Sequence, residues 1–329
     1  MGECPHAAYF YCWFSPFNII KIPRKCSLDR LPLTSHRISL ALCDSNPPML
    51  SYRHAFHAGG IADVHKHAVL ALLLDHFRNR DKPYAVIDIY AGRGVYGLNS
   101  LEAQKRKEFE HGIAKLIARP DRLPQLKTYW AAVDAVNEAG LARYPGSPHI
   151  VRHQMRDGDD LIVNELHPAD YEDLRRWAGD APNIHVHRRN ALEAIVALVP
   201  PSIRRGLVLV DPSYEIKTEY DTVPVAVSKS FAKWPQGVFA VWYPVLVEDR
   251  YVATRQKLLE LIPADILQTE FDLGRRKDYD GMQSSGLWII NPPWKIEEEI
   301  DRAGLWLAKQ LGQERPARHR MMWLRQSKG

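Results

Sequence analysis

Cysteine is scarce in this chain of 329 residues, and the little there is lies near the start. The four cysteines, Cys4, Cys12, Cys26 and Cys43, all precede Met49, and their spacings match no zinc-binding pattern. The rest of the chain needs no disulfide and hence no oxidising compartment. The sequence therefore argues against a disulfide framework and against a zinc site built on cysteine.

Long apolar runs are absent as well. No run reaches the ~18 residues that a membrane-spanning helix needs. The apolar stretch at 7–14 (AAYFYCWF) follows a single charged residue, the acidic Glu3, whereas a signal peptide begins with basic residues. We therefore expect a cytoplasmic protein without a membrane partner.

Neither sign of charge predominates: 44 lysines and arginines face 39 aspartates and glutamates, for a net charge of +5. This small excess permits a nucleic-acid partner without arguing strongly for one. Basic residues cluster at 105–107, 204–205, 275–277 and in the tail after residue 314. For each cluster, a solvated surface and a phosphate-binding site are equally open interpretations.

The first 48 residues contain six prolines and no sustained hydrophobic period. We interpret residues 1–48 as an irregular extension, which an upstream translation start would explain. The remainder, 49–329, is expected to be the functional domain, and it is long enough to bury a large core.

Beyond residue 80, short β-prone apolar runs alternate with helical patterns. Such alternation is typical of an open, mainly parallel α/β sheet. The stretch of about 100–143 is expected to be an inserted helical subdomain, and the last strand, before Asn291, to be an antiparallel edge. Strands are expected at 84–89, 160–168, 184–190, 205–211, 237–245, 266–273 and 286–290, and helices at 102–120, 123–140, 170–179, 191–201 and 249–262.

The segment SYRHAFHAGGIADVHKH at 51–67 holds four histidines around Asp63, which suggests a metal site. Asp63 is expected to be the N-cap of a helix whose apolar residues recur three and four apart. Residues two apart on a helix point about 200° away from each other, so His65 and His67 cannot share one ion. His54 and His57 would need a distant partner, and no cysteine pair supplies one. We expect no metal; solvent-exposed histidines are the simple alternative.

Unusual sequences follow the predicted strands, and ligands of an open α/β sheet bind outside the carboxyl ends of its strands. Asp88 is followed by Gly92 and Gly94, a loop that lets a ligand approach the backbone. It has neither the G-x-G-x-x-G spacing nor the lysine of a P-loop. Glu165 ends the next strand and is suited to bind ribose hydroxyls, although it lies much further along than the usual ~20 residues. A surface carboxylate is the alternative.

The sequence DPSY at 211–214 indicates a reaction at an exocyclic amine, a poor nucleophile because the ring delocalises its lone pair. A site that methylates such an amine needs two acceptors for the amine hydrogens. Asp211 and the carbonyl of Pro212 supply them, and Tyr214 can stack on a base taken out of its helix. NPPW, beginning at Asn291, is a similar motif. Position favours Asp211, which follows a wholly apolar, central strand.

With these residues in view, the chain resembles the RlmJ family of large-subunit ribosomal RNA adenine-N6 methyltransferases. The resemblance runs from Met49 to about Lys295 and implies a Rossmann-like class I methyltransferase sheet with an inserted helical subdomain. It implies S-adenosylmethionine as cofactor and one adenine of 23S rRNA, position 2030, as substrate. The motifs that carry it are MLSYRHAFHAG, ADVHKH, DKP, YPGSP, ELHP, RRGLVLVDPSYE, WYP and INPPWK.

The resemblance also assigns residues. It places Tyr52 and His54 toward the RNA, while His57 and His65 stay unassigned and are expected to be structural. The expected catalytic residues are Asp211, Pro212 and Tyr214. The expected cofactor-binding residues are Lys66, His67, Asp88, Tyr90, Gly92, Ser147, Glu165, Asn190, Ala191 and Asp211.

This chain departs from the family pattern at several positions. Tyr90 stands where the family has His, and Asn190-Ala191 stands for Asp-Gly. Ser213 replaces the second proline of D-P-P-Y and frees the backbone beside the two acceptors. Because Asp211, Pro212 and Tyr214 are kept, activity is favoured.

The sequence therefore predicts a methyltransferase that moves the methyl group directly, without a covalent enzyme intermediate. Its partner is expected to be 23S rRNA before or early in subunit assembly, and the protein a monomer. One alternative is adenine methylation in DNA. The other is a catalytically degraded nucleic-acid-binding protein, for which the departures at Tyr90, Asn190 and Ser213 are the argument.

Overall fold

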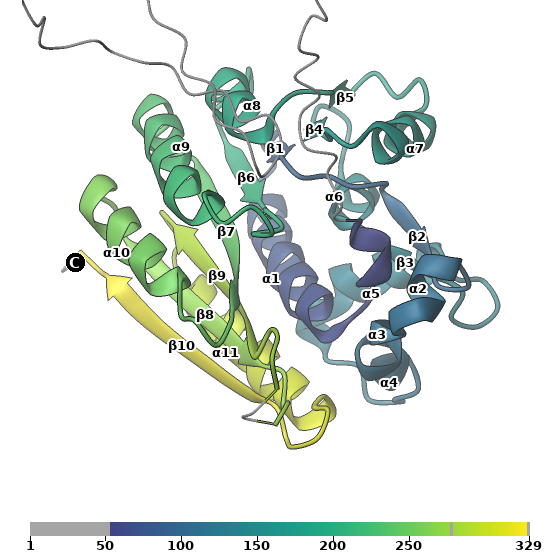
Figure 1. Ribbon diagram of the computed structural model, residues 1–329. Coiled ribbons are helices and arrows are strands. Elements are labelled where there is room, and N and C mark those ends of the chain that lie inside the picture. The colour runs from purple at the N-terminus through teal and green to yellow at the C-terminus, as the bar shows by residue number, and fades with distance from the viewer. Residues whose placement is uncertain (1–52, 277–278, 328–329) are drawn as a thin grey trace, which may run out of the picture. The chain divides into compact units, whose positions relative to one another are not determined.

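A computed structural model describes residues 53–276 and 279–327 of the chain (Figure 1). Residues 50–329 belong to one compact unit. The expected extension at 1–48 and Tyr52 lie outside the described residues. Within the described part, no helix is both long and apolar enough to cross a membrane.

An eight-stranded sheet forms the centre of this unit, in the order β10-β8-β9-β7-β6-β1-β4-β5. The five strands from β5 to β7 pair in parallel, whereas β9 is antiparallel to both its neighbours and β10 is antiparallel to β8. The predicted mostly parallel α/β sheet is confirmed. The strands are β1 (Ala85–Asp88), β4 (Asp160–Asn164), β5 (Ile184–His187), β6 (Gly206–Val210), β7 (Val238–Val245), β8 (Ile266–Asp272), β9 (Ser284–Ile290) and β10 (Arg318–Arg325).

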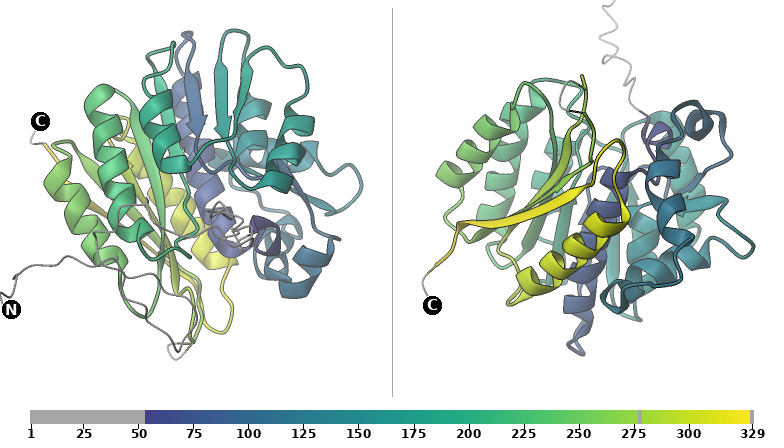
Figure 2. Two further views of the ribbon diagram at one scale, coloured as in Figure 1. Left: turned by 45° about the horizontal axis from the view of Figure 1, so that its top comes forward. Right: turned by 90° about the horizontal axis from the view of Figure 1, so that it is seen from below.

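Helices cover both faces of the sheet (Figure 2). The alternation along β6 explains why, since Leu207 and Leu209 belong to one apolar cluster and Val208 and Val210 to the other. The first cluster includes residues of α1 (Ile61–Arg78), α6 (Ser147–Gln154), α7 (Pro168–Ala178) and α11 (Ile296–Gln310). The second includes residues of α8 (Ala191–Leu198), α9 (Glu219–Lys233) and α10 (Tyr251–Leu261).

The stretch expected to be inserted is bracketed by a small antiparallel ladder, β2 (Val95–Gly97) with β3 (Arg143–Pro145). Between them lie α2 (Leu101–Arg106), α3 (Glu108–His111), α4 (Ile113–Ile117), η2 (Pro124–Leu126) and α5 (Lys127–Ala135). The single helix predicted at 102–120 is wrong. The chain breaks at Lys107, which is left-handed, and at Gly112, which packs so closely on the backbone of Gly59 and Gly60 that a side chain would not fit.

The end of the chain also differs from the prediction. The strand before Asn291 is antiparallel as expected, but β9 lies inside the sheet between β7 and β8. The edge strand is β10, which lies in the stretch expected to be a basic tail. Its side chains alternate between more and less exposed. Helices α9 and α11 were not predicted; α9 contains Pro224 in its interior, which disguises its pattern.

Candidate functional site

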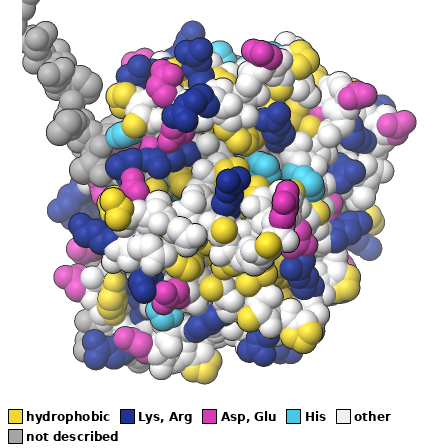
Figure 3. Space-filling model, turned by 90° about the vertical axis from the view of Figure 1, so that its right-hand side faces the viewer, with side chains coloured by type: hydrophobic (Ala, Val, Ile, Leu, Met, Phe, Trp, Pro, Cys, Tyr) yellow, Lys and Arg dark blue, Asp and Glu magenta, His cyan; other side chains and the backbone are white. Residues whose placement is uncertain are grey.

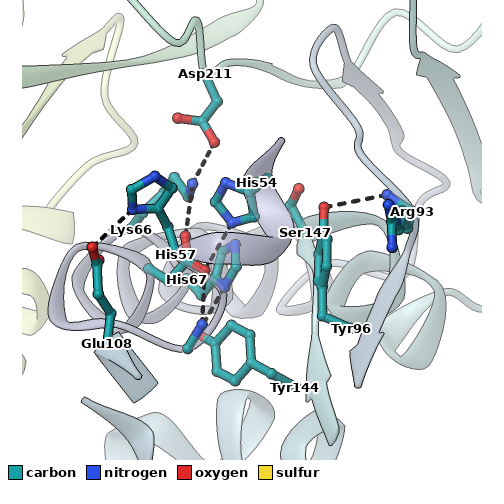
Figure 4. A network of polar contacts seen from close by, with 12 residues as sticks. His54, His57, Lys66, His67, Arg93, Tyr96, Glu108, Tyr144, Ser147 and Asp211 are labelled. Carbon is teal, nitrogen blue, oxygen red and sulfur yellow. Dashed lines mark hydrogen bonds and ion pairs between the residues drawn. The ribbon is translucent and has the colours of Figure 1, made fainter. Parts of the chain in front are cut away.

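Three acidic residues stand at the carboxyl ends of adjacent parallel strands. Asp88 ends β1, Glu165 follows β4, and Asp211 follows β6. Because β4, β1 and β6 are neighbours and run in parallel, their carboxyl ends lie side by side at the same end of the sheet. The structure therefore brings together the acidic positions that the sequence singled out. Helix α1 adds Lys66, which lies against Asp211 (Figure 4).

Lys66 of α1 joins two carboxylates. Its Nζ is bound to Oδ2 of Asp211 and lies 3.1 Å from Oδ1 of Asp63, and only 3% of the residue is exposed. Although burial opposes it, the charges of Asp211 and Asp63 raise the pKa of Lys66. Lys66 is therefore an ammonium ion at neutral pH, and it also lies 5.7 Å from the ring centre of Trp242.

Asp63 is not the N-cap that the sequence predicted. Helix α1 begins at Ile61 after Gly60, so Asp63 is already in the first turn. From there its Oδ2 accepts the backbone N–H of Gly59 at 3.0 Å and lies 2.9 Å from Nε2 of His54. Burial opposes ionisation, but His54 and Lys66 hold the pKa of Asp63 well below its usual range.

The remaining histidines of the segment have protein partners. His57 Nδ1 lies 2.9 Å from Glu108 Oε1, and His67 Nδ1 lies 2.9 Å from the hydroxyl of Tyr144. His65 is bound to hydroxyl groups of β8 and β9. The solvent-exposed alternative is wrong for His65 and His67, which are each 2% exposed. Burial lowers the pKa of His67 to about 3.

Asp88 is completely buried at the end of β1. Its Oδ2 accepts a 2.6 Å hydrogen bond from the hydroxyl of Ser147, the first residue of α6. Its Oδ1 is buried and has no hydrogen-bond partner among the described residues. Burial raises the pKa of Asp88 to about 7, partly offset by the Ser147 hydrogen bond. A buried acceptor without a partner is the kind of group that a ligand satisfies.

Glu165 is tied to the glycine loop. Its Oε2 accepts the N–H of Gly92 at 2.9 Å, and its Oε1 accepts the N–H of His167 at 2.7 Å. Glu165 is half-buried, and burial raises its pKa. These two backbone contacts distinguish it from a carboxylate that only faces solvent. Gly92 has a φ of 63°, and a side chain there would overlap the hydroxyl of Tyr96. The loop needs glycine at this position.

The departures from the family pattern lie near the same edge. Asn190 caps α8, with its Oδ1 accepting the N–H of Leu192 at 3.0 Å, and Ala191 is the first helical residue. Tyr90 lies beside the carboxylate of Glu219, and burial raises its pKa. The side-chain carbonyl of Asn190 is thus engaged in holding the helix end.

Tyr214 is less accessible than stacking on a base requires. The residue is 5% exposed, and its ring lies 4.5 Å from that of Tyr220 and 6.2 Å from that of Trp242. Its hydroxyl donates to the carbonyl of Trp242 at 3.2 Å. Pro212 is buried beside it, and the hydroxyl of Ser213 accepts the N–H of Glu215 at 3.4 Å. A base can reach this ring only after the loop rearranges.

Asn291 lies at the other end of the sheet, away from the carboxyl ends of the parallel strands. Because β9 is antiparallel to β7, its carboxyl end adjoins the start of β7. The Asn291 amide donates to the carbonyls of Pro235 and Gly237, both at 3.2 Å. NPPW therefore forms a turn that cannot share a site with Asp88.

Sequence reasoning missed several members of the network. Arg93, inside the glycine loop, has its Nε 2.6 Å from Asp170 and 3.4 Å from Asp173. The amide of Asn164 donates to the carbonyls of Ile89 and Arg189, both at 3.1 Å, and so ties the ends of β1, β4 and β5 together. Arg93 lies within a loop already singled out, whereas Asn164 gave no signal.

Comparisons with known proteins agree with this geometry. The family model described as "Ribosomal RNA large subunit methyltransferase D, RlmJ" matches residues 81–325. Ribosomal RNA large subunit methyltransferase J of Escherichia coli (strain K12) is 38% identical over 264 residues, which cover 80% of this chain and 94% of the relative. The protein of the same name from Haemophilus influenzae is 36% identical over 278 residues, covering 84% and 99%.

A solved structure resembles the whole unit. The crystal structure of protein LPL1258 from Legionella pneumophila has a TM-score of 0.75 at 32% sequence identity, covering 81% of this chain and 98% of that one. Together with the strand order, this likeness confirms the Rossmann-like class I methyltransferase fold expected from the sequence.

Proposed function

The chain belongs to the RlmJ family of ribosomal RNA large subunit methyltransferases, and we propose that it methylates N6 of one adenine in 23S rRNA with S-adenosylmethionine. The observation that carries this proposal is the ion pair of Lys66 with Asp211 at the end of β6. It fixes an acceptor at the edge where Asp88 and Glu165 also lie. This edge is where an open α/β sheet binds its ligands.

The residues present fit the cofactor. S-adenosylmethionine supplies a methyl group on a positively charged sulfur and also carries an ammonium group and a ribose. The free Oδ1 of Asp88 is suited to a cationic group, and Glu165 keeps acceptor capacity for ribose hydroxyls beyond its two backbone contacts. Gly92 lets the ligand approach the backbone. Around them we place Lys66, His67, Tyr90, Ser147, Asn190, Ala191 and Asp211.

Asp211 and Pro212 orient the amine of the substrate. Lys66 holds Oδ2 of Asp211, which leaves Oδ1 to accept one amine hydrogen while the Pro212 carbonyl accepts the other. Both acceptors strengthen as positive charge develops on N6, so they favour the transition state over the bound substrate. When bound, S-adenosylmethionine would supply its methyl group to N6 and leave as S-adenosylhomocysteine. Asp211 or water would accept the proton that N6 loses.

Tyr214 and the arm before α1 take part in substrate binding in this proposal. Stacking of the adenine requires the ring of Tyr214 to exchange its packing against Tyr220 or Trp242 for the base. His54 is held through Asp63 and faces the same edge, beside Tyr96 at 5.2 Å. We assign His54, and Tyr52 two residues before it in the sequence, to the RNA.

The expected form of the substrate is RNA that the ribosomal proteins have not yet covered. An adenine inside a helix must be unstacked before its N6 can react, and bound proteins would hinder that step. Protein-free 23S rRNA should therefore be methylated faster than assembled large subunits. We propose that the enzyme acts as a monomer.

Two measurements test the function. Calorimetry with S-adenosylmethionine separates an enzyme from a protein that only binds nucleic acid, the alternative that the buried ring of Tyr214 favours. Incubation with unmodified 23S rRNA, followed by nucleoside mass spectrometry, should yield N6-methyladenosine at one position. Methylation of adenine in DNA but not in rRNA, or of another atom of the base, would overturn the proposal.

A further inference from the structure

A row of polar side chains crosses the sheet beneath helices α1 and α11. This buried row takes one residue from each of six elements: Trp242 of β7, Ser285 of β9, His65 of α1, Thr269 of β8, His319 of β10 and Asp301 of α11. Ser285, Thr269 and the side chain of His319 are fully buried, whereas the side chain of Asp301 is 46% exposed. Figure 3 shows histidines at the surface of the face that carries the inserted helices, but those of the buried row are covered.

Each residue of the buried row contacts the next. The indole Nε1 of Trp242 donates to Oγ of Ser285 at 2.9 Å, and this oxygen lies 3.1 Å from Nδ1 of His65. On the other side of the imidazole, Nε2 of His65 lies 3.3 Å from Oγ1 of Thr269. The same threonine oxygen lies 2.9 Å from Nε2 of His319. The contacts therefore continue without a break through both histidines.

The indole end of the buried row fixes the order of its protons. Burial lowers the pKa of His65 and of His319, so at pH 7 each ring has one donor and one acceptor nitrogen. The indole N–H of Trp242 can only donate, so the oxygen of Ser285 accepts it and directs its own proton to Nδ1 of His65. The ring of His65 therefore carries its proton on Nε2.

The carboxylate end gives the same order. A carboxylate only accepts, and Oδ1 of Asp301 lies 3.3 Å from Nδ1 of His319, a distance that allows an ion pair but not a well-directed hydrogen bond. The charge of Asp301 favours a proton on that nitrogen and leaves Nε2 of His319 to accept from Thr269. The oxygen of Thr269 then accepts the proton of His65. Both ends thus assign the same tautomer to His65.

The indole end of the buried row lies at the proposed transfer site. The last paired residues of β6 and β7 directly precede Asp211 and Trp242, so these two residues lie side by side. The ring of Trp242 is centred 5.7 Å from Nζ of Lys66 and 6.2 Å from the ring of Tyr214. An indole has a single N–H, and in Trp242 it is held by Ser285. What fixes the oxygen of Ser285 therefore also fixes the orientation of the ring.

We propose that His65 is a positioning residue of methyl transfer, which fixes the indole ring of Trp242 through Ser285. By accepting the hydroxyl proton of Ser285, His65 turns the serine oxygen toward the indole N–H. An ammonium within ~6 Å of an indole ring is attracted to its face, so the fixed ring helps to keep Lys66 on Asp211. The inference rests on the proposed function, because the pair of Lys66 with Asp211 matters here as part of the transfer site.

Two amide substitutions separate the two sides of the imidazole. The amide of His65→Asn lies near the position of Nδ1 and can still accept from Ser285, whereas the longer His65→Gln reaches the position of Nε2 and contacts Thr269. Ser285→Ala removes the acceptor of the indole outright. In methyl transfer to unmodified 23S rRNA, kcat should fall about three- to tenfold in His65→Gln and Ser285→Ala, as the loss of one hydrogen bond implies. KM for S-adenosylmethionine should stay nearly unchanged, and His65→Asn should retain most of the wild-type kcat.

The matched control is Ser230→Ala. Ser230 is also fully buried, but its hydroxyl donates within α9, to the carbonyl of Ala226 at 2.9 Å, so its removal should leave kcat unchanged. A second readout is the indole N–H resonance of Trp242 in proton–nitrogen NMR spectra, which Trp242→Phe identifies. The resonance should shift and exchange faster with water in His65→Gln and Ser285→Ala, and it should stay in place in His65→Asn and in the control.

Equal losses of kcat in the two variants of His65 would overturn the inference, because they would leave the buried row a purely structural feature. A loss in Ser230→Ala as large as that in Ser285→Ala, or an unmoved indole resonance in Ser285→Ala, would overturn it too. Thermal unfolding verifies that each variant is folded. If the wild-type protein transfers no methyl group, the proposed function fails, and the indole resonance still decides whether His65 fixes the ring.

Discussion

The ammonium of Lys66 is bound to the carboxylate of Asp211, which lies 145 residues further along the chain. Lys66 also contacts Asp63, and Asp63 contacts His54 of the preceding arm. One chain of polar contacts thus runs from the arm expected to meet the RNA to the acceptor expected to hold the amine. These contacts hold Asp211 in position, and breaking them should lower the stability of the fold.

Removing the ammonium should destabilise the fold. Lys66→Met leaves two carboxylates without their cation, and breaking a buried ion pair in this way costs ~3–5 kcal/mol. Adding Asp63→Asn removes one of the two stranded charges, so the double variant should lose less than the sum of the single variants. Chemical denaturation measures both. Arg176→Ala, which breaks an exposed pair with Asp173, should change stability by less than ~1 kcal/mol; a similarly small loss for Lys66→Met would contradict this account.

Stability should fall with falling pH because His67 is buried in its neutral form. Its pKa is about 3 in the folded protein and ~6.5 in an unfolded chain. Between these values only the unfolded state binds the proton, so stability is complete above pH ~6.5 and declines as pH falls toward 3. From pH 7 to 5 this amounts to about 2 kcal/mol. His67→Gln should lose that much less over the same interval, and identical pH profiles would exclude the role of His67.

The ionisation of Asp88 predicts that the affinity for the cofactor depends on pH. With a pKa of about 7 raised by burial, Asp88 is largely protonated at pH 6 and largely ionised at pH 7.5. If its Oδ1 binds a cationic group of S-adenosylmethionine, affinity should rise several-fold over that interval. Calorimetry at both pH values tests this. Asp88→Asn should bind weakly and without the pH dependence, whereas an equal slope in that variant would assign the proton to another residue.

Gly92 and Gly97 form a matched pair for the glycine loop. Ala at Gly92 must adopt a φ of 63° and push against the Tyr96 hydroxyl, whereas Ala at Gly97 meets no atom within 4 Å. Gly92→Ala should cost ~1–3 kcal/mol of stability and weaken cofactor binding. Gly97→Ala should change both little. Equal effects of the two substitutions would show that the close approach at Gly92 does not matter.

Part of this arrangement was predictable from the sequence. The wholly apolar run before Asp211 indicates a central strand. Asp211, Asp88 and Glu165 each follow or end a predicted parallel strand, so they are expected at the same end of the sheet. The pair of Lys66 with Asp211 is a long-range contact that no local pattern encodes. No local pattern encodes the burial of His65 and His67 either. It arises because α1 is enclosed by the sheet, the inserted helices and α11 on nearly all sides. Because the tail is rich in charged residues, its pattern does not predict β10. The sequence therefore does not predict which strand lies at the edge of the sheet.

The most direct test of the central claim compares two substitutions in methyl transfer to unmodified 23S rRNA at saturating S-adenosylmethionine. Asp211→Ala removes one of two acceptors that act as charge develops on N6, and the rate should fall by ~10²–10³. Asn291→Ala disturbs only a turn at the opposite edge, so its rate should stay within a few-fold once folding is verified. Ser213→Pro should hold or raise the rate by stiffening the acceptor pair. An inactive Asn291→Ala together with an active Asp211→Ala would contradict the assignment of the site.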